Sequence, residues 1–138
     1  MMSIEHLANE VRMACQQVSR RVRFEAGSQI PPHQASVLFK LQDGPRTPGE
    51  LADAERIAPP SMTKTVSCLA EKGLVTRDDN PSDGRSKLVA LTDAGRAAID
   101  EVVRVRDDWM VHKLEGLSEA ELDLLERATE LLNRVVAK

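Results

Sequence analysis

Apolar residues recur every three or four positions in two stretches of the chain, one near each end. The first stretch runs from Ile4 to Val22 and the second from Leu122 to Val136. This spacing places the apolar side chains on one face of an α-helix. The pattern therefore predicts two long amphipathic helices, whose apolar faces are larger than one small domain needs.

Helix-start signals divide the middle of the chain into shorter helices. Thr47 and Glu50 form a capping box, and Pro59-Pro60 opens a second helix that should end at Gly73. An earlier helix should begin near Pro32. Two short helices joined by a tight turn are typical of a helix-turn-helix.

A polar turn follows, between two short β-prone runs at residues 74–77 and 87–91. Thr92 then caps another long helix, and Ser118 with Glu121 forms the capping box of the last one. The pattern as a whole predicts a mainly α fold with a small β-hairpin, in which the hairpin is a wing beside the helix-turn-helix.

Three motifs in this order resemble the MarR family of bacterial transcription regulators. They are Thr47-Pro48-Gly49-Glu50-Leu51-Ala52, then Pro60-Ser61-Met62-Thr63-Lys64 with Leu69 and Gly73-Leu74-Val75, then Asp83-x-Arg85 with Leu88-x-x-Leu91-Thr92-x-x-Gly95. The last motif is the most discriminating. The resemblance covers essentially the full chain and implies a single domain, residues 1–138. In it, about 31–92 form a winged helix-turn-helix DNA-binding lobe, and about 1–30 and 93–138 are dimerisation helices.

The helix expected at 59–73 has one buried face and one face of small polar residues. Its buried side should consist of Met62, Val66, Leu69 and Ala70. The polar side can enter a major groove without steric clash, and the helix N-terminus offers N–H groups to phosphates. An arginine at the tip of the wing suits a narrow minor groove. We therefore expect contacts with double-stranded DNA from Pro60, Ser61, Thr63, Lys64, Ser67, Arg85, Ser86 and Lys87.

The wing also carries acids. Asp83 can pair with Arg77 across the base of the hairpin or accept backbone N–H groups of its own turn, and the family pattern favours the pairing. Either bond would brace the wing. Asp78 and Asp79 are expected to be solvated and to limit non-specific affinity for DNA.

A single recognition helix reads few base pairs, so we expect a homodimer on a pseudo-palindromic site. The candidates for its intersubunit core are Val11, Val18, Leu122, Leu125, Leu132, Val135 and Val136. The resemblance further implies a small phenolic or other lipophilic effector. Arg20, His33 and Trp109 are candidates for lining its site, although a histidine near a helix start is more often a surface residue and a lone tryptophan more often core.

The two cysteines are too few for a disulfide framework. Cys15 lies on the apolar stripe of the first helix, where core packing is the better interpretation. Cys68 is placed on the outward face of the recognition helix, where oxidation would block entry into DNA. A thiol-based, redox-responsive regulator is therefore an alternative to one released by a ligand.

Charge and composition restrict the other classes. The net charge of −3 arises mainly in the C-terminal third, so a basic face is allowed but not demanded. This balance keeps open a winged-helix protein-interaction module that does not bind DNA. No nucleophile–base pair, phosphate loop or cluster of metal ligands is recognisable, so we expect no enzyme, cofactor or metal. No signal peptide or membrane-spanning run is visible, which favours the cytoplasm and no membrane partner.

Overall fold

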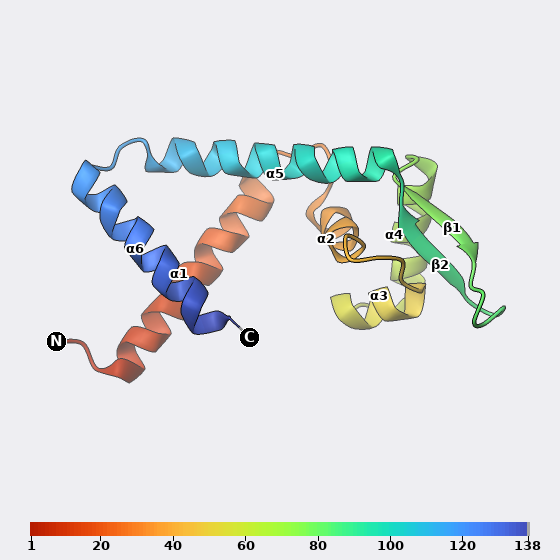
Figure 1. Ribbon diagram of the computed structural model, residues 1–138, viewed down its shortest axis with the longest axis horizontal. Helices are drawn as coiled ribbons and strands as arrows, with labels where there is room; N and C mark the ends of the chain where they lie inside the picture. The colour runs from red at the N-terminus through yellow and green to blue at the C-terminus, as the bar shows by residue number, and fades with distance from the viewer. Residues whose placement is uncertain (138) are drawn as a thin grey trace. The chain divides into compact units, whose positions relative to one another are not determined.

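The computed structural model describes residues 1–137, and its secondary structure confirms the predicted fold class (Figure 1). In chain order the elements are α1 (Ile4–Glu25), α2 (Pro32–Lys40), α3 (Pro48–Glu55), α4 (Pro59–Glu71), β1 (Val75–Asp79), β2 (Lys87–Leu91), α5 (Asp93–Leu114) and α6 (Glu119–Val136). No helix within residues 1–137 is both long enough and apolar enough to cross a membrane.

The chain divides into two compact units, Met1–Arg106 and Asp107–Lys138. The first contains α1 to β2 and most of α5, and the second contains the end of α5 and α6. The expected boundaries of a DNA-binding lobe at 31–92 with flanking dimerisation helices stay a prediction.

The hydrophobic core lies in the first unit, where α2, α3 and α4 pack with the wing. Met62, Val66 and Leu69 are buried on α4, as the helical wheel predicts. Ala70, expected with them, is only half-buried, and Thr65 is buried in addition. Each fully buried aliphatic side chain contributes about 1.5–3 kcal/mol relative to exposure. The largest fully buried side chains are Leu38, Leu51, Met62, Leu69, Val37, Val66, Val89 and Val102.

Specific local interactions define both ends of α3. Thr47 Oγ1 accepts a hydrogen bond from the Glu50 N–H at 3.1 Å, and the Glu50 carboxylate accepts one from the Thr47 N–H at 3.3 Å, which confirms the capping box. Arg56 ends the helix with φ 56° and ψ 44°, in the left-handed region. This reversal turns the chain sharply, so that α4 begins after residues 56–58.

β1 and β2 pair antiparallel, from Val75 opposite Leu91 to Asp79 opposite Lys87. Val89 also exchanges two backbone hydrogen bonds with Arg46, at 2.8 and 3.0 Å. The segment that leads into α3 is therefore tied to the wing.

Thr92 joins the end of α4, the wing and the start of α5. Its Oγ1 donates to the Gly73 carbonyl at 2.7 Å and accepts from the Gly95 N–H at 3.0 Å. Its own N–H donates to the Leu74 carbonyl at 3.1 Å. The predicted cap of α5 is thus also a clamp on the turn that follows α4.

Candidate nucleic-acid interface

The exposed face of α4 carries small polar residues beside one lysine. Pro60, Ser61, Thr63 and Lys64 are exposed, and Ser67 is half-buried. The Thr63 hydroxyl donates to the Pro59 carbonyl at 3.1 Å, so it is left as an acceptor toward any ligand. The face therefore combines a cation, hydroxyl groups and little bulk.

The start of α4 offers fewer N–H donors than a helix N-terminus usually does. No side chain caps it at Ala58, which leaves the first turn open. A helix start leaves four backbone N–H groups without an intrahelical partner. Pro59 and Pro60 have no N–H, so only the N–H groups of Ala58 and Ser61 remain here. The expected anion site at this terminus is correspondingly small.

Arg77 links the wing to α4. Its Nη1 donates to Ser67 Oγ at 3.0 Å, which joins β1 to the middle of the helix. The alternative of an ion pair between Arg77 and Asp83 does not form among residues 1–137. Instead Asp83 Oδ1 accepts the N–H of Arg85 at 3.0 Å, so this carboxylate bonds to the backbone of its own turn.

The tip of the wing is held by its own polar side chains. Asn80 Oδ1 accepts the Ser82 N–H at 3.0 Å, and Asn80 Nδ2 donates to Ser86 Oγ at 3.1 Å. Ser86 is half-buried within this turn. Within the described part of the chain, the exposed guanidinium of Arg85 has no ion pair or hydrogen bond, so it is the group at the tip that is available to a partner.

Lys87 is already engaged. Its Nζ lies 2.5 Å from Asp79 Oδ1, and the two residues face each other in the register of the hairpin. The hydrogen bond from Lys87, with its charge, holds the pKa of the Asp79 carboxyl below its usual range. The expectation that Asp79 is only solvated was therefore wrong.

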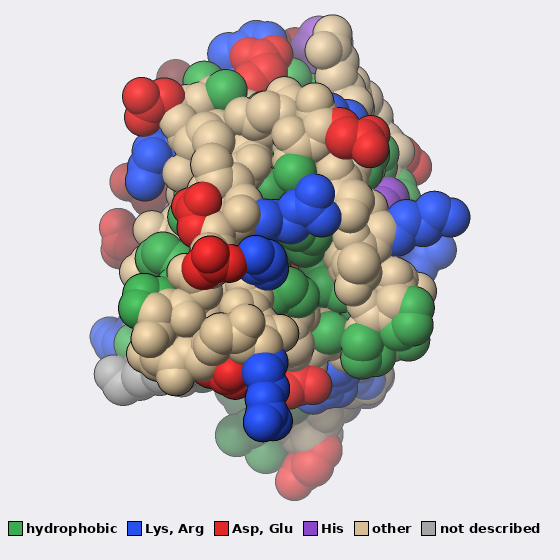
Figure 2. Space-filling model, turned by 90° about the vertical axis from the view of Figure 1, so that its right-hand side faces the viewer, with side chains coloured by type: hydrophobic (Ala, Val, Ile, Leu, Met, Phe, Trp, Pro, Cys, Tyr) green, Lys and Arg blue, Asp and Glu red, His purple; other side chains and the backbone are tan. Residues whose placement is uncertain are grey.

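Figure 2 shows the side of the molecule that carries the wing. Lys and Arg side chains are interspersed there with Asp and Glu side chains and do not form one continuous basic patch. A partner of this face would be recognised by individual cations at particular positions, in agreement with the net charge of −3.

Comparisons with known proteins agree with this arrangement. A family model described as the MarR family matches residues 28–86, which run from before α2 to the tip of the wing. An HTH-type transcriptional regulator of Mycobacterium bovis is 36% identical over 132 residues, 94% of this chain and 92% of that protein. The chain belongs to the MarR family.

Solved structures extend the likeness to almost the whole chain. Wild-type MarR from E. coli, in its apo form, has a TM-score of 0.75 and 27% identity, over 99% of this chain and 98% of that one. The YusO protein from Bacillus subtilis has a TM-score of 0.73 and 25% identity, over 96% and 99%. The protein is therefore a MarR-family transcriptional regulator with a winged helix-turn-helix fold, and regulators of this family bind DNA.

One of the two cysteines of this MarR-family chain does not lie where the sequence placed it. Cys68 is half-buried and faces α2, where its Sγ accepts a hydrogen bond from Gln34 Nε2 at 3.3 Å. Gln34 is itself buried and accepts from Lys72 Nζ at 2.7 Å. Cys15 is exposed, because α1 has no buried residue in the described chain. Cys15 therefore packs in no core of the single chain, and its expected packing on the apolar face of α1 stays a prediction that depends on the dimer.

Of the three candidate effector-binding residues, Arg20 and His33 belong to the first unit and Trp109 to the second. The Arg20 guanidinium is 5.6 Å from the ring centroid of Phe24 on α1. His33 is exposed at the start of α2. Trp109 belongs to the second unit, where the Lys113 ammonium lies 5.2 Å from its ring centroid. Arg20 borders a hollow on α1 whose lining residues do not include His33.

A pair of arginines in the first unit, Arg23 and Arg106, was not predicted from the sequence. Arg106 is partly buried on α5, with its guanidinium 5.4 Å from the ring centroid of Phe39. Burial lowers its pKa, and the positive charge of Arg23 on α1 lowers it further. Within residues 1–137 no ion pair joins either guanidinium to a carboxylate. The signal was not in the local sequence, because Arg23, Phe39 and Arg106 come from three different helices.

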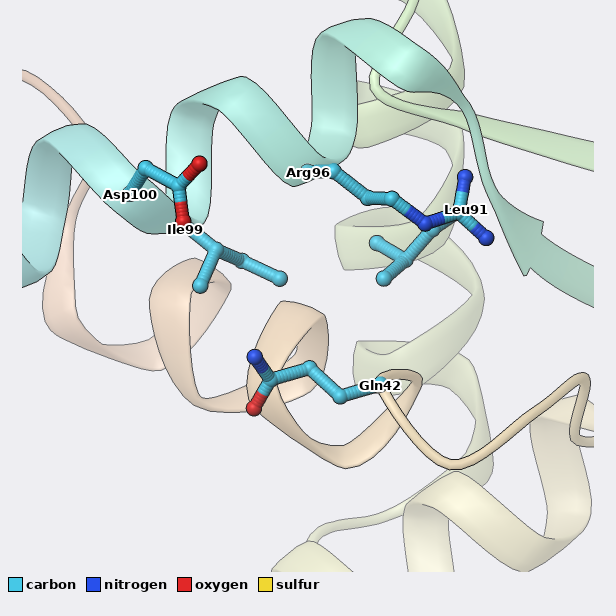
Figure 3. A pocket seen from close by; sticks show the side chains of 5 residues that line it. All are labelled: Gln42, Leu91, Arg96, Ile99 and Asp100. Atoms are coloured by element: carbon cyan, nitrogen blue, oxygen red, sulfur yellow. The ribbon is translucent and has the colours of Figure 1, made fainter.

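A small hollow of about 240 Å³ lies between the end of α2 and the start of α5 (Figure 3). It is lined by Gln42, Leu91, Arg96, Ile99 and Asp100. The guanidinium of Arg96 extends toward Leu91, away from the Asp100 carboxylate, and also pairs with Asp93 at 3.6 Å. The polar groups of the hollow therefore do not converge on one bound atom.

Proposed function

We propose that this MarR-family regulator is a homodimeric repressor that binds a pseudo-palindromic operator through α4 and the wing. The observation that carries the proposal is the small polar face of α4 beside a wing whose Arg85 guanidinium has no partner within residues 1–137. A protein-interaction module without DNA binding is less well supported, because such a face would usually expose aromatic or large apolar side chains.

The residues of the interface divide by role. Pro60, Ser61, Thr63, Lys64 and Ser67 enter the major groove, where Lys64 meets a phosphate or a guanine edge. Arg85 enters the adjacent minor groove, and Lys87 follows the backbone. Ser86, whose hydroxyl is used in the turn, supports Arg85 and at most shares a phosphate.

Two exposed apolar faces support the dimer. Neither α1 nor α6 has a buried residue, although both helices are long and amphipathic. On α1, Leu7 is 50% and Val18 44% exposed, and on α6, Leu122 and Leu125 are each 42% exposed. Apolar faces of this extent mark interfaces, and a second copy of this chain supplies a matching face through two-fold symmetry.

Fluorescence anisotropy with the DNA upstream of the protein's own coding sequence tests the DNA-binding part. We expect saturable, salt-sensitive binding in which Arg85→Ala costs about 1 kcal/mol or more. Arg104→Ala is the matched control, since it removes the same charge from an exposed position on α5. Equal losses of DNA affinity from both variants would mean that Arg85 contributes only its net charge, and would contradict a direct contact between the wing and DNA. Transcription from that DNA in vitro decides whether the protein represses.

Sedimentation equilibrium tests the dimer. Val18→Glu places a carboxylate in the apolar face of α1 and should shift the protein toward the monomer. Gln17→Glu introduces the same group at the neighbouring exposed position and should leave the dimer intact. A wild-type monomer at micromolar concentration, or equal effects of the two variants, would contradict the assignment.

The effector that the geometry supports is an amphipathic anion. Arg106 lies beside the Phe39 ring, and the positive charge of Arg23 lowers its pKa, so an anionic ligand would relieve the repulsion between the two arginines. Isothermal titration with benzoate and with neutral benzyl alcohol tests the charge requirement. We expect binding of benzoate alone, and its loss in Arg106→Gln. Equal binding of both compounds would contradict the proposal of an anionic effector.

The thiol-responsive alternative rests on Cys68, which α4 turns toward Gln34 and not toward the exposed face. Its half-buried position slows attack by peroxide, which makes this alternative weaker than a ligand. Gel shifts with and without peroxide test it. Loss of DNA binding in the wild type, but not in Cys68→Ser, would reinstate it.

A further inference from the structure

Asp79 and Lys87 form the last cross-strand pair of the wing before its loop. The contact between Lys87 Nζ and Asp79 Oδ1 is 2.5 Å long, and both side chains remain open to solvent, Lys87 at 57% and Asp79 at 87% exposure. An approaching ligand can therefore reach the ammonium, but it meets the carboxylate at the same place.

Lys87 cannot serve Asp79 and a DNA phosphate equally well. An exposed ion pair is weak enough to open when a phosphate competes for the cation. Opening it leaves the Asp79 carboxylate beside the negative DNA backbone. That carboxylate then repels the phosphates or retains a cation from solution, and a retained cation offsets one of those released when Lys87 neutralises a phosphate.

We propose that Asp79 is an internal competitor of the DNA phosphates for Lys87, a specific affinity-limiting residue of the wing. The inference rests on the proposed function, because it requires the wing to approach DNA. Phosphate contacts carry no base information, so Asp79 restrains binding to operator and non-operator DNA alike. It keeps the protein from accumulating on the large excess of non-specific sites.

Asp78 provides an internal control. It is the preceding residue of β1, is exposed like Asp79, and carries the same charge. It stands opposite Leu88 in the hairpin, so its partner across the ladder has no charge. Among the described residues, Asp78 forms no ion pair with a lysine, arginine or histidine. Replacing either aspartate by asparagine changes the net charge equally, and only Asp79→Asn frees Lys87.

The test compares Asp79→Asn, Asp78→Asn, Lys87→Gln and the double variant Asp79→Asn/Lys87→Gln in the full chain, after circular dichroism has shown equal folding. Anisotropy is measured over a series of salt concentrations, with the upstream DNA and with an unrelated duplex of equal length. Asp79→Asn should tighten binding to both duplexes about two- to fivefold. It should also steepen the slope of log affinity against log salt by about one.

Asp78→Asn should tighten binding less, and once Lys87 is glutamine, Asp79→Asn should tighten it no more than Asp78→Asn does. Equal effects of the two asparagine variants would show that only net charge matters and would overturn the inference while leaving the proposed function standing. A full effect of Asp79→Asn in the Lys87→Gln background would do the same. A wild-type protein without saturable binding to either duplex would overturn the proposed function, and the inference with it.

Discussion

Gly95 sits against the carbonyl oxygen of Leu74 so closely that a Cβ at this position would lie 2.1 Å from that oxygen. The approach results from Thr92, which binds the Gly73 carbonyl and the Gly95 N–H at once and draws the first turn of α5 onto the turn after α4. Glycine is required here for space, since the neighbouring atom is backbone and cannot rotate away.

Gly95→Ala should therefore lower the free energy of unfolding by about 1–3 kcal/mol, the usual cost of an overpacked site. Urea denaturation followed by circular dichroism measures the change. Gly116→Ala is the control, because a Cβ at Gly116 would meet no atom within 4 Å. A stability of Gly95→Ala equal to that of the control would mean that the junction yields easily.

Local signals were sufficient to predict the elements and their ends. Each helix cap depends on residues only three apart, so it can be predicted from the local sequence. This holds for the capping boxes at Thr47 and Ser118 and for the cap at Thr92. The same holds for Met62, Val66 and Leu69 on the buried side of α4, whose positions follow from helical periodicity.

Contacts between elements could not be predicted in this way. The sequence placed the end of the first wing strand at Arg77, whereas β1 continues to Asp79 and thereby sets Asp79 opposite Lys87. Arg77 bonds to Ser67 because α4 packs beside the wing, and Cys68 accepts a hydrogen bond from Gln34 because α2 packs beside α4. Each of these partners depends on tertiary packing, which no local pattern encodes.

Arg56 is the one residue other than glycine with a positive φ within residues 1–137. An L-residue in the left-handed region costs about 1–2 kcal/mol, and glycine would remove this strain. The greater conformational freedom of glycine in the unfolded chain offsets part of the stability gained. Arg56→Gly should therefore stabilise the protein by up to about 1 kcal/mol in thermal or urea unfolding. Arg56→Ala removes the same charge and keeps the strain, so a similar gain from Arg56→Ala would contradict this explanation.

The capping box of α6 should make the stability of that helix depend on pH. The Ser118 N–H, and then its hydroxyl, hold the pKa of Glu121 below its usual range. Because the folded pKa is lowered, this contribution is fully present above the ordinary glutamate pKa and is lost as the pH falls through the lower, folded value.

Glu121→Gln keeps an oxygen that can accept the Ser118 N–H but cannot titrate. We expect thermal melts between about pH 6 and pH 3 to show a smaller loss of stability for this variant than for the wild type. Glu119→Gln removes a charge from the same helical turn without touching the cap. If the two variants gave the same pH profile, helix-end charge and not the hydrogen bond would be responsible.

The hydrogen bond from Arg77 Nη1 to Ser67 Oγ should make these two residues act together in DNA binding. The Arg77 side chain fixes the position of the wing relative to α4 through its hydrogen bond to the Ser67 hydroxyl. Ser67→Ala and Arg77→Ala should each weaken binding, and the double variant should bind about as well as the worse single variant. Anisotropy on the upstream DNA measures the double-mutant cycle.

Lys64 and Arg77 form the matched comparison, since they share no hydrogen bond or ion pair in the described chain and their substitutions should add. Additive losses for Ser67 and Arg77 as well would mean that each meets the DNA independently and that the link does not position the wing. Unfolding experiments separate this from a loss of fold. A single hydrogen bond contributes about 0.5–1.5 kcal/mol, so both single variants should remain folded at the temperature of the binding measurement.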